Sequence, residues 1–157
     1  DLKTGSEREK AYVQEHKTAC IMQIGRKLRS GKPHDGRAPD YDDWTTPNSD
    51  GFCGLNGDLL VWNSILDRSI ELSSMGIRVN KETLVKQLEY KNEMHKLQSP
   101  YAQNILNDVL PLTIGGGIGQ SRMCMYMLKK AHIGEVQSSI WPEEMVLKCK
   151  ESGIDIL

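Results

Sequence analysis

A glycine-rich run that ends in an arginine constrains this chain more than any other feature. Ten residues, Thr113 to Arg122, contain four glycines. Glycine has no Cβ, so its backbone can approach a ligand closely, and a helix N-terminus adds oriented N–H groups and partial positive charge. We predict a short strand at Leu112–Ile114, a glycine bend, and a helix over residues 119–130 that is apolar nearly all round. Arg122 would then lie in the first helical turn and reach a phosphate group as a planar fork.

The spacing of these glycines excludes two common nucleotide-binding patterns. No Gly-Lys-Ser/Thr follows the run, so it is not a P-loop. Gln120 occupies the position where a dinucleotide fingerprint needs its last glycine. A tight turn between a strand and a buried helix is the alternative, since glycine clusters usually mark turns. The glycines that we single out are Gly115, Gly116, Gly117 and Gly119.

Length and charge indicate one globular domain. The chain has 157 residues, a net charge of −1 and 38% hydrophobic residues. Its 20 Lys and Arg are interspersed with 21 Asp and Glu, so we expect no nucleic-acid partner. We also expect no membrane partner, because no apolar run approaches the roughly 20 residues that span a bilayer. Four widely spaced cysteines without a C-x-x-C are typical of reduced thiols in a cytoplasmic protein.

Hydrophobic periodicity and helix formers predict alternating helices and strands over residues 1–157, taken as one domain. The predicted helices cover 4–17, 81–98, 100–109 and 119–130, with a last one that begins at Pro142. The predicted strands cover 18–25, 58–63, 68–79, Leu112–Ile114 and Glu135–Ile140. Residues 29–57 are rich in Gly, Pro, Asp and Asn, and we predict a long loop there, which in compact domains is usually functional or disordered.

Two carboxylates lie on the two central strands. If these strands form a hairpin that turns near Ser64–Ile65, Asp58 is opposite Glu71, and like charges in that position repel unless a cation lies between them. Mg²⁺ suits such a place, because it binds one or two carboxylates together with nucleotide phosphates. The alternative is a solvated sheet face on which Asp58 simply begins a strand.

The segment from His34 to Trp44 is the second dense cluster of functional side chains. Arg37 could bind a carboxylate, Asp42 an ammonium group, and Tyr41 could form an aromatic wall. A free amino acid presents that pair of charges, and a guanidinium fork would fix its orientation. The alternative is an ordinary acidic turn around Pro39.

Several motifs together resemble one family, the ammonia-dependent asparagine synthetases, also called aspartate–ammonia ligases. The resemblance covers almost the whole chain. It is carried by the stretches Arg37–Trp44 (RAPDYDDW), Gly54–Asp58 (GLNGD), Glu71–Val79 (ELSSMGIRV) and Gly115–Arg122 (GGGIGQSR), with His132-Ile133-Gly134 and Trp141-Pro142. That family is similar in fold to the catalytic domain of class II aminoacyl-tRNA synthetases. The resemblance therefore implies an α+β fold, an antiparallel sheet flanked by helices, and a glycine–arginine run that holds ATP.

The resemblance also implies a two-step reaction. ATP and L-aspartate would give β-aspartyl-AMP and pyrophosphate, and ammonia would then convert the adenylate to L-asparagine and AMP. By motif, Arg122 would contact the outer phosphates, and Gly117 with its neighbours would line the adenosine pocket. Asp58 and Glu71 would serve the Mg²⁺–phosphate region. The residues that would hold aspartate or the incoming amide are Arg37, Tyr41, Asp42 and Ser73 or Ser74.

The family chain is about twice as long as this one, and its first half, with two of the three class II signatures, has no counterpart here. The chain also begins at Asp1 rather than methionine. We therefore expect either a fragment or a protein whose other half is a separate polypeptide, inactive and poorly stable alone, and a homodimer when complete. Two alternatives stay open: an aspartyl-tRNA synthetase-like enzyme, and a non-catalytic ligand-binding paralogue.

Overall fold

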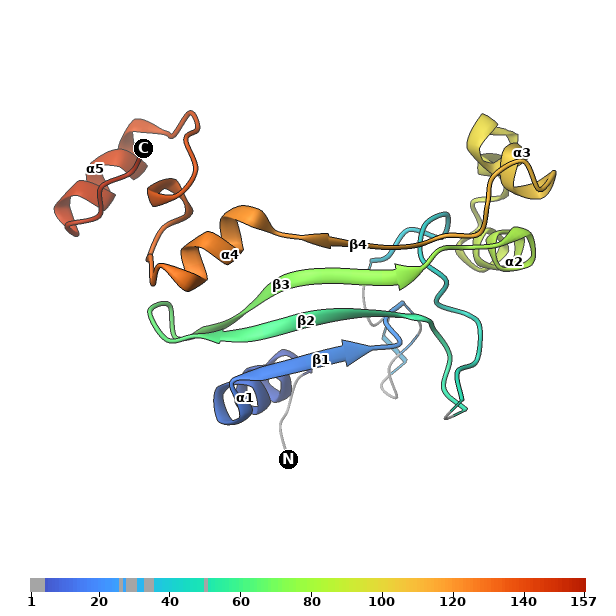
Figure 1. Ribbon diagram of the computed structural model, residues 1–157, viewed down its shortest axis with the longest axis horizontal. Helices are drawn as coiled ribbons and strands as arrows, with labels where there is room; N and C mark the ends of the chain where they lie inside the picture. The colour runs from blue at the N-terminus through green and yellow to red at the C-terminus, as the bar shows by residue number, and fades with distance from the viewer. Residues whose placement is uncertain (1–4, 26, 28–30, 33–35, 50) are drawn as a thin grey trace. The chain divides into compact units, whose positions relative to one another are not determined.

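The computed structural model describes residues 5–25, 27, 31–32, 36–49 and 51–157. Four strands form one antiparallel sheet in the order β1-β2-β3-β4 (Figure 1). The strands are β1 (Thr18–Met22), β2 (Asn56–Asn63), β3 (Arg68–Ile77) and β4 (Ile114–Ile118). Together with five α-helices among the described residues, they confirm the predicted α+β class with an antiparallel sheet.

The chain divides into two compact units. The first comprises residues 1–19, 59–73 and 118–157, and the second comprises residues 20–58 and 74–117. The boundary crosses all four strands, so each unit contains a stretch of every one of them. Each unit is described by itself.

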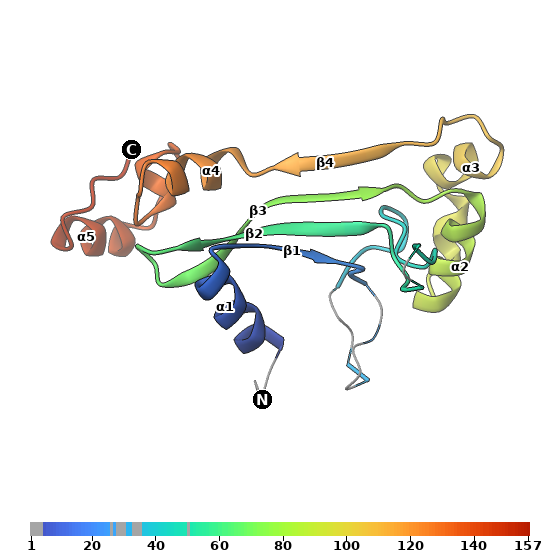
Figure 2. The same cartoon turned by 60° about the horizontal axis from the view of Figure 1, so that its bottom comes forward.

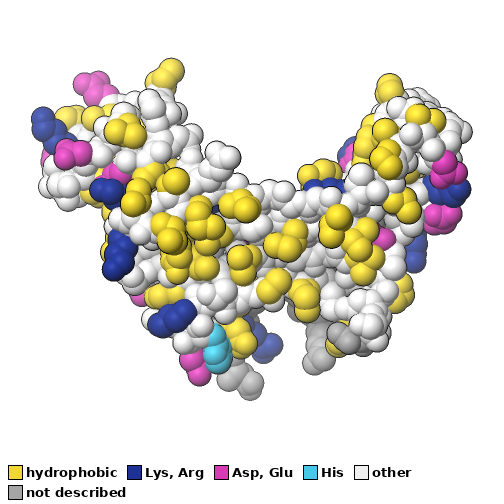
Figure 3. Space-filling view, viewed as in Figure 1, with side chains coloured by type: hydrophobic (Ala, Val, Ile, Leu, Met, Phe, Trp, Pro, Cys, Tyr) yellow, Lys and Arg dark blue, Asp and Glu magenta, His cyan; other side chains and the backbone are white. Residues whose placement is uncertain are grey.

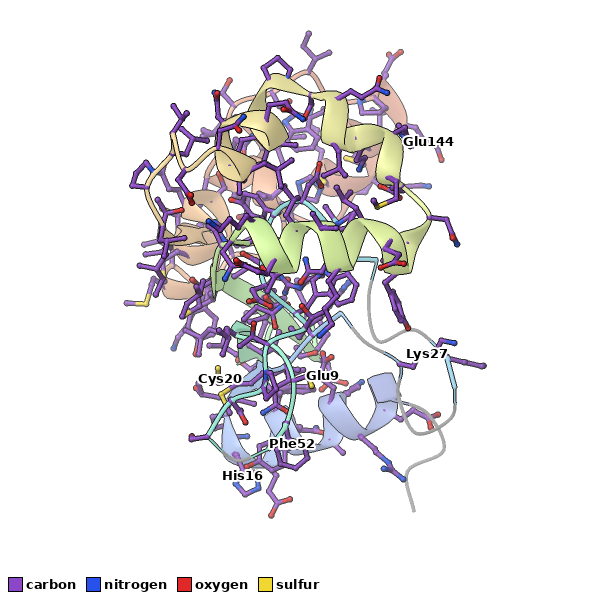
Figure 4. All side chains as sticks on the ribbon, turned by 90° about the vertical axis from the view of Figure 1, so that its right-hand side faces the viewer. Glu9, His16, Cys20, Lys27, Phe52 and Glu144 are labelled. Carbon is purple, nitrogen blue, oxygen red and sulfur yellow. The ribbon has the colours of Figure 1, made fainter. Side chains whose placement is uncertain are left out.

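In the first unit, helix α1 (Gly5–His16) is joined to the hairpin by polar contacts. Glu9, which is labelled in Figure 4, lies on this helix. Its carboxylate accepts a hydrogen bond from the Ser69 hydroxyl at 2.7 Å. Val13 on the same helix is fully buried, and Leu60, Val61 and Trp62 on β2 are buried as well. The unit ends with α4 (Gln120–Met127), the 3₁₀-helix η2 (Ile133–Glu135) and α5 (Glu143–Glu151), where Glu144 pairs with Lys148.

In the second unit, two helices and a 3₁₀-helix enclose a small apolar core. Helices α2 (Lys81–Lys91) and α3 (Pro100–Leu106) contact one another and η1 (Met94–Gln98) (Figure 2). Local chemistry explains the helix starts: Asn80 forms a capping box with Thr83, and Ser99 caps the turn that Pro100 begins. The buried core residues are Val79, Leu84, Leu88 and Ala102.

Several predicted elements differ from the structure. The predicted helix over 81–98 ends at Lys91, because Asn92 adopts the left-handed conformation and its N–H caps the preceding turn. The predicted strand Glu135–Ile140 is wrong, since η2 occupies residues 133–135 and no strand follows among the described residues up to α5. No helix in the described part of the chain has both the length and the apolar character of a membrane span.

The glycine-rich run is a strand where a bend was predicted. β4 includes Gly115, Gly116 and Gly117, none of which has a positive φ. The helix after it, α4, is shorter than predicted. Its sequence is apolar on most sides, as expected, but Met125 is the one α4 residue that is buried. Ile114 and Ile118 of β4 are exposed, among the hydrophobic side chains that reach the surface (Figure 3).

Candidate functional site

A cluster of ion-paired side chains lies in the second unit, at the end of β3. We call it the loop cluster, and it consists of Arg37, Asp42, Asp58, Ser74 and Arg78. Arg37 donates from one nitrogen to Asp42 and to the Ser74 hydroxyl, both at 3.1 Å, and from the other to Asp58. Arg78 donates to the second oxygen of Asp42. Asp42 therefore bridges two guanidinium groups, and the cluster contains as many carboxylates as guanidiniums.

Tyr41 holds Arg78 from the outer side of the loop cluster. Its ring centre lies 3.9 Å from the guanidinium carbon of Arg78, a cation–π contact, and its hydroxyl accepts a hydrogen bond from the same group at 2.9 Å. Tyr41 and Asp42 are neighbours in the loop. Together they orient the Arg78 guanidinium, since the Tyr41 ring packs against its face and the Asp42 carboxylate accepts a hydrogen bond from its edge. The aromatic wall predicted from the sequence is thus built against a cation.

A second tyrosine, Tyr101, lies near Asp40 and Arg78. Burial raises the pKa of Tyr101, and the negative charge of Asp40 adds to the effect, while Arg78 opposes it. Lys96 pairs with Asp40 across 3.7 Å, and its pKa is raised, chiefly by its hydrogen bond to Glu93. The rim beside the loop cluster therefore keeps a neutral phenol and a charged ammonium group at neutral pH.

Glycines let these side chains lie directly on the sheet. A Cβ on Gly76 would come within 2.8 Å of the Asp42 carboxylate, and one on Gly115 within 2.5 Å of the Arg78 guanidinium. Both contacts are closer than real Cβ atoms make, so a larger residue at either position would force the facing side chain to shift. Above Gly117 no atom lies within 4 Å of the Cβ position, which leaves open space at the strand surface. Close approach, and not a bend, is what this run provides.

The hairpin register differs from the predicted one. The Ile77 N–H donates to the Leu55 carbonyl at 2.9 Å, and Gly76 faces Asn56, so the residue opposite Asp58 is Ser74. The predicted pairing of Asp58 with Glu71 is therefore wrong. Glu71 lies three residues before Ser74 on β3, and strand side chains an odd number of residues apart leave opposite faces. This register gives no support to a cation shared between the two carboxylates.

The same alternation separates the two serines that the sequence left open. Ser74 shares its face of β3 with Gly76 and contacts Arg37. Ser73, its neighbour, is directed to the other face of the strand and is buried. Of the two, Ser74 is the one that the structure places in the loop cluster.

A second, smaller group lies in the first unit, where β4 leads into α4. We call it the helix pair, and it consists of Arg122 and Glu71. Arg122 lies in the first turn of α4, as predicted, and donates to the Glu71 carbonyl at 3.1 Å, with the Glu71 carboxylate 3.6 Å away. Gly119 precedes the helix, and its N–H donates to Leu72 of β3. The arginine therefore stands beside one acidic group at a glycine-flanked helix start.

The described residues contain no group of three or more His, Cys, Asp or Glu side chains that could hold a metal ion. Mg²⁺ does not require such a group of side chains, because the ion is usually bound through one or two carboxylates together with substrate phosphates. Glu71 fits that pattern, since its carboxylate is partly exposed and lies beside Arg122. Asp58 fits it less well, because Arg37 already occupies its carboxylate.

Sequence reasoning missed Arg78 as a site residue. A signal was present, because Ser74, Gly76 and Arg78 are spaced by two along the chain, and such positions share a strand face. Once Ser74 is considered for the site, Arg78 follows from the alternation. His34 and Asp35, which open the predicted ligand-binding segment, lie outside the described residues.

The fold defines the class of protein: an α+β protein with one antiparallel sheet flanked by helices. Residues 2–153 match the family model described as aspartate–ammonia ligase. The chain belongs to the aspartate–ammonia ligase family.

Curated relatives give the same result. The aspartate–ammonia ligase of Bacteroides fragilis is 55% identical over 150 residues, which are 96% of this chain and 44% of the relative. That of Clostridium tetani is 56% identical over 154 residues, which are 98% of this chain and 42% of the relative. The chain thus spans less than half of the length of the curated relatives it matches.

Proposed function

We propose that this chain supplies the ligand-binding part of an enzyme that makes L-asparagine from L-aspartate, ammonia and ATP. In the first step, a β-carboxylate oxygen of aspartate bonds to the α-phosphorus of ATP and pyrophosphate leaves. In the second, ammonia bonds to the β-carbonyl carbon, AMP leaves and a proton is lost. The loop cluster is the observation that carries this proposal, because its charges match those of a free amino acid.

The loop cluster suits aspartate for a physical reason. Aspartate presents two carboxylates and one ammonium group, and the cluster offers two guanidiniums and two carboxylates at short range. We assign substrate carboxylates to Arg37 and Arg78, and the ammonium group, or the incoming ammonia, to Asp42. Ser74 and Tyr41 add hydroxyl groups at the same place. Asp58 enters this proposal as the carboxylate that holds Arg37.

We assign the adenosine to the glycine strand and, independently, the outer phosphates of ATP to the helix pair. Open space above Gly117 leaves room for a flat ring against the strand, with Gly115, Gly116 and Gly119 as neighbours in the run. Arg122 is half-exposed at the start of α4, and its guanidinium is accessible to the outer phosphates. Mg²⁺ belongs to the proposal as the counter-ion of these phosphates, with Glu71 as its protein carboxylate; bound there, it would neutralise phosphate charge.

The proposal extends to the complete protein. It would be a cytoplasmic homodimer with free ammonia as the nitrogen source, in which the remaining part of the family's length completes the site. We define the completed protein as these 157 residues joined to the part of the Bacteroides fragilis relative that they do not cover.

Pyrophosphate exchange tests the proposal. The completed protein is expected to exchange labelled pyrophosphate into ATP only when L-aspartate is present. Arg37→Lys keeps the charge but loses the fork, so its KM for aspartate should rise. The control Arg68→Lys changes an exposed arginine on β3 and should leave it unaltered. Absence of aspartate-dependent exchange in the completed protein would overturn the proposal.

A further inference from the structure

Gln87 on α2 is a fully buried polar side chain that contacts the loop bearing Asp42. Its amide nitrogen donates to the Pro39 carbonyl at 2.8 Å and to the Asp42 carbonyl at 3.0 Å. Its amide oxygen accepts from the Trp44 N–H at 2.8 Å and from the Thr45 hydroxyl at 3.3 Å. One side chain thus makes four hydrogen bonds, which are all that an amide offers.

These bonds reach the loop on both sides of Asp42. Two fall before or at this residue and two follow it, so the backbone there is fixed from the α2 side. From the sheet side, the Val79 N–H donates to the Tyr41 carbonyl and the Asp43 N–H donates to the Ile77 carbonyl, both at 2.9 Å. Asp42 therefore lies between a strand and a buried amide, and the backbone that carries its side chain cannot move without breaking one of these sets of hydrogen bonds.

We propose that Gln87 is a positioning residue that holds the Asp42 carboxylate between Arg37 and Arg78, and so sets the affinity for the amino-acid substrate. The inference rests on the proposed function for the identity of that substrate. Gln87 does not touch the charged groups of the cluster; it acts through the backbone. All four hydrogen-bond partners of the amide lie in residues 39–45, so the hydrogen bonds that a substitution removes all belong to that segment.

The test compares two substitutions on the same helix in the completed protein. Gln87→Met keeps the size of the side chain but removes all four hydrogen bonds. Thr83→Val is the matched control, because it removes the hydroxyl of the α2 capping box, whose hydrogen bonds are made with Asn80. Pyrophosphate exchange gives the KM values for aspartate and for ATP separately, and urea unfolding gives the stability of each variant.

We expect Gln87→Met to raise the KM for aspartate about tenfold or more, because small misplacements of positioning groups are costly. Its KM for ATP should stay within about twofold, and Thr83→Val should leave both constants within that range. A purely structural role would lower the amount of active protein in both variants without a selective rise in one KM. Unchanged aspartate KM in Gln87→Met would overturn the inference.

A second readout does not depend on activity. Hydrogen–deuterium exchange of residues 39–46 should be faster in Gln87→Met than in Thr83→Val, since the Trp44 N–H loses its acceptor. If the unaltered completed protein does not exchange pyrophosphate into ATP, the proposed function fails. Hydrogen–deuterium exchange then tests by itself whether Gln87 positions Asp42. Equal rates of hydrogen–deuterium exchange for residues 39–46 in both variants would overturn the inference about Gln87.

Discussion

The loop cluster and the helix pair are both built from arginines and acids, yet they differ in how much water they meet. The four charged side chains of the loop cluster are between 3% and 15% exposed, whereas Arg122 and Glu71 are 52% and 41% exposed. Asp42 has two guanidinium partners, and glycines let them lie against the sheet. Arg122 has one acidic partner and a backbone carbonyl.

This difference separates two ways of binding a charged ligand. Buried ion pairs lose their hydration, so each charge depends on its partners and the geometry is fixed in advance. Exposed pairs contribute little to stability because water screens them, and they can exchange partners easily. Under the proposed function, the loop cluster would select one small molecule, and the helix pair would bind a phosphate tail that can move. Four predictions test this contrast, ordered by the expected change in the free energy of unfolding.

Asp42→Asn should have the largest effect. It removes the charge that bridges Arg37 and Arg78, and breaking a buried pair typically costs about 3–5 kcal/mol. Urea unfolding of the completed protein measures the loss. Asp108→Asn is the control, since Asp108 pairs with Lys81 in an exposed position. A loss for Asp42→Asn no greater than for the control would show that the cluster is no more preorganised than a surface pair.

Two alanine substitutions on one strand should differ from one another. In Gly115→Ala the new methyl meets the Arg78 guanidinium, and such overpacking costs about 1–3 kcal/mol. In Gly117→Ala the methyl meets open space, so stability should change by about 0.5 kcal/mol or less. The second variant should instead raise the KM for ATP in pyrophosphate exchange. Equal unfolding free energies for the two variants would contradict the close-approach account of β4.

Tyr41→Phe should have a smaller effect on stability than Asp42→Asn or Gly115→Ala. It removes the hydroxyl that accepts from Arg78 but keeps the ring beneath the guanidinium, and a typical hydrogen bond contributes about 1 kcal/mol. Tyr41→Ala removes both contacts and should raise the aspartate KM further than Tyr41→Phe. If the two variants have the same aspartate KM, the cation–π contact has no part in orienting Arg78.

Changes in the helix pair should leave stability almost unaltered. Glu71→Gln and Arg122→Lys each weaken an exposed ion pair, worth about 1 kcal/mol or less. Pyrophosphate exchange should nevertheless fall about 100-fold in Arg122→Lys, because a group that stabilises developing phosphate charge is lost. A large loss of stability with unchanged exchange would reverse the contrast between the two groups.

Much of the local structure follows from short-range chemistry. Asn80 before α2 and Ser99-Pro100 before α3 are capping patterns that predict where helices begin. Asn92 stops α2 by adopting a left-handed conformation, and that is a weaker signal in sequence, so the predicted helix ran too far. The glycines of β4 were interpreted as a bend, because the sequence around a glycine does not show whether it serves a turn or the close approach of another strand.

The candidate site was predictable in part for the same reason. Arg37, Tyr41 and Asp42 lie in one short segment, and the structure brings them together. Arg122 and Glu71 meet as well, although they are far apart in the chain. Asp58 was assigned to the wrong partner because hairpin register depends on pairing along the whole strand, and a shift of an odd number of residues turns a side chain to the other face.

By itself, the sequence determined which residue types were available, where most helices and strands begin, and that arginine, aspartate and glycine are concentrated in a few short runs. Only the tertiary structure decided that Ser74 and not Glu71 lies opposite Asp58, that Arg78 joins Asp42, and that Gln87 anchors the loop between them. These are contacts between distant segments, whose formation depends on strand register and on the burial of groups that no local pattern specifies.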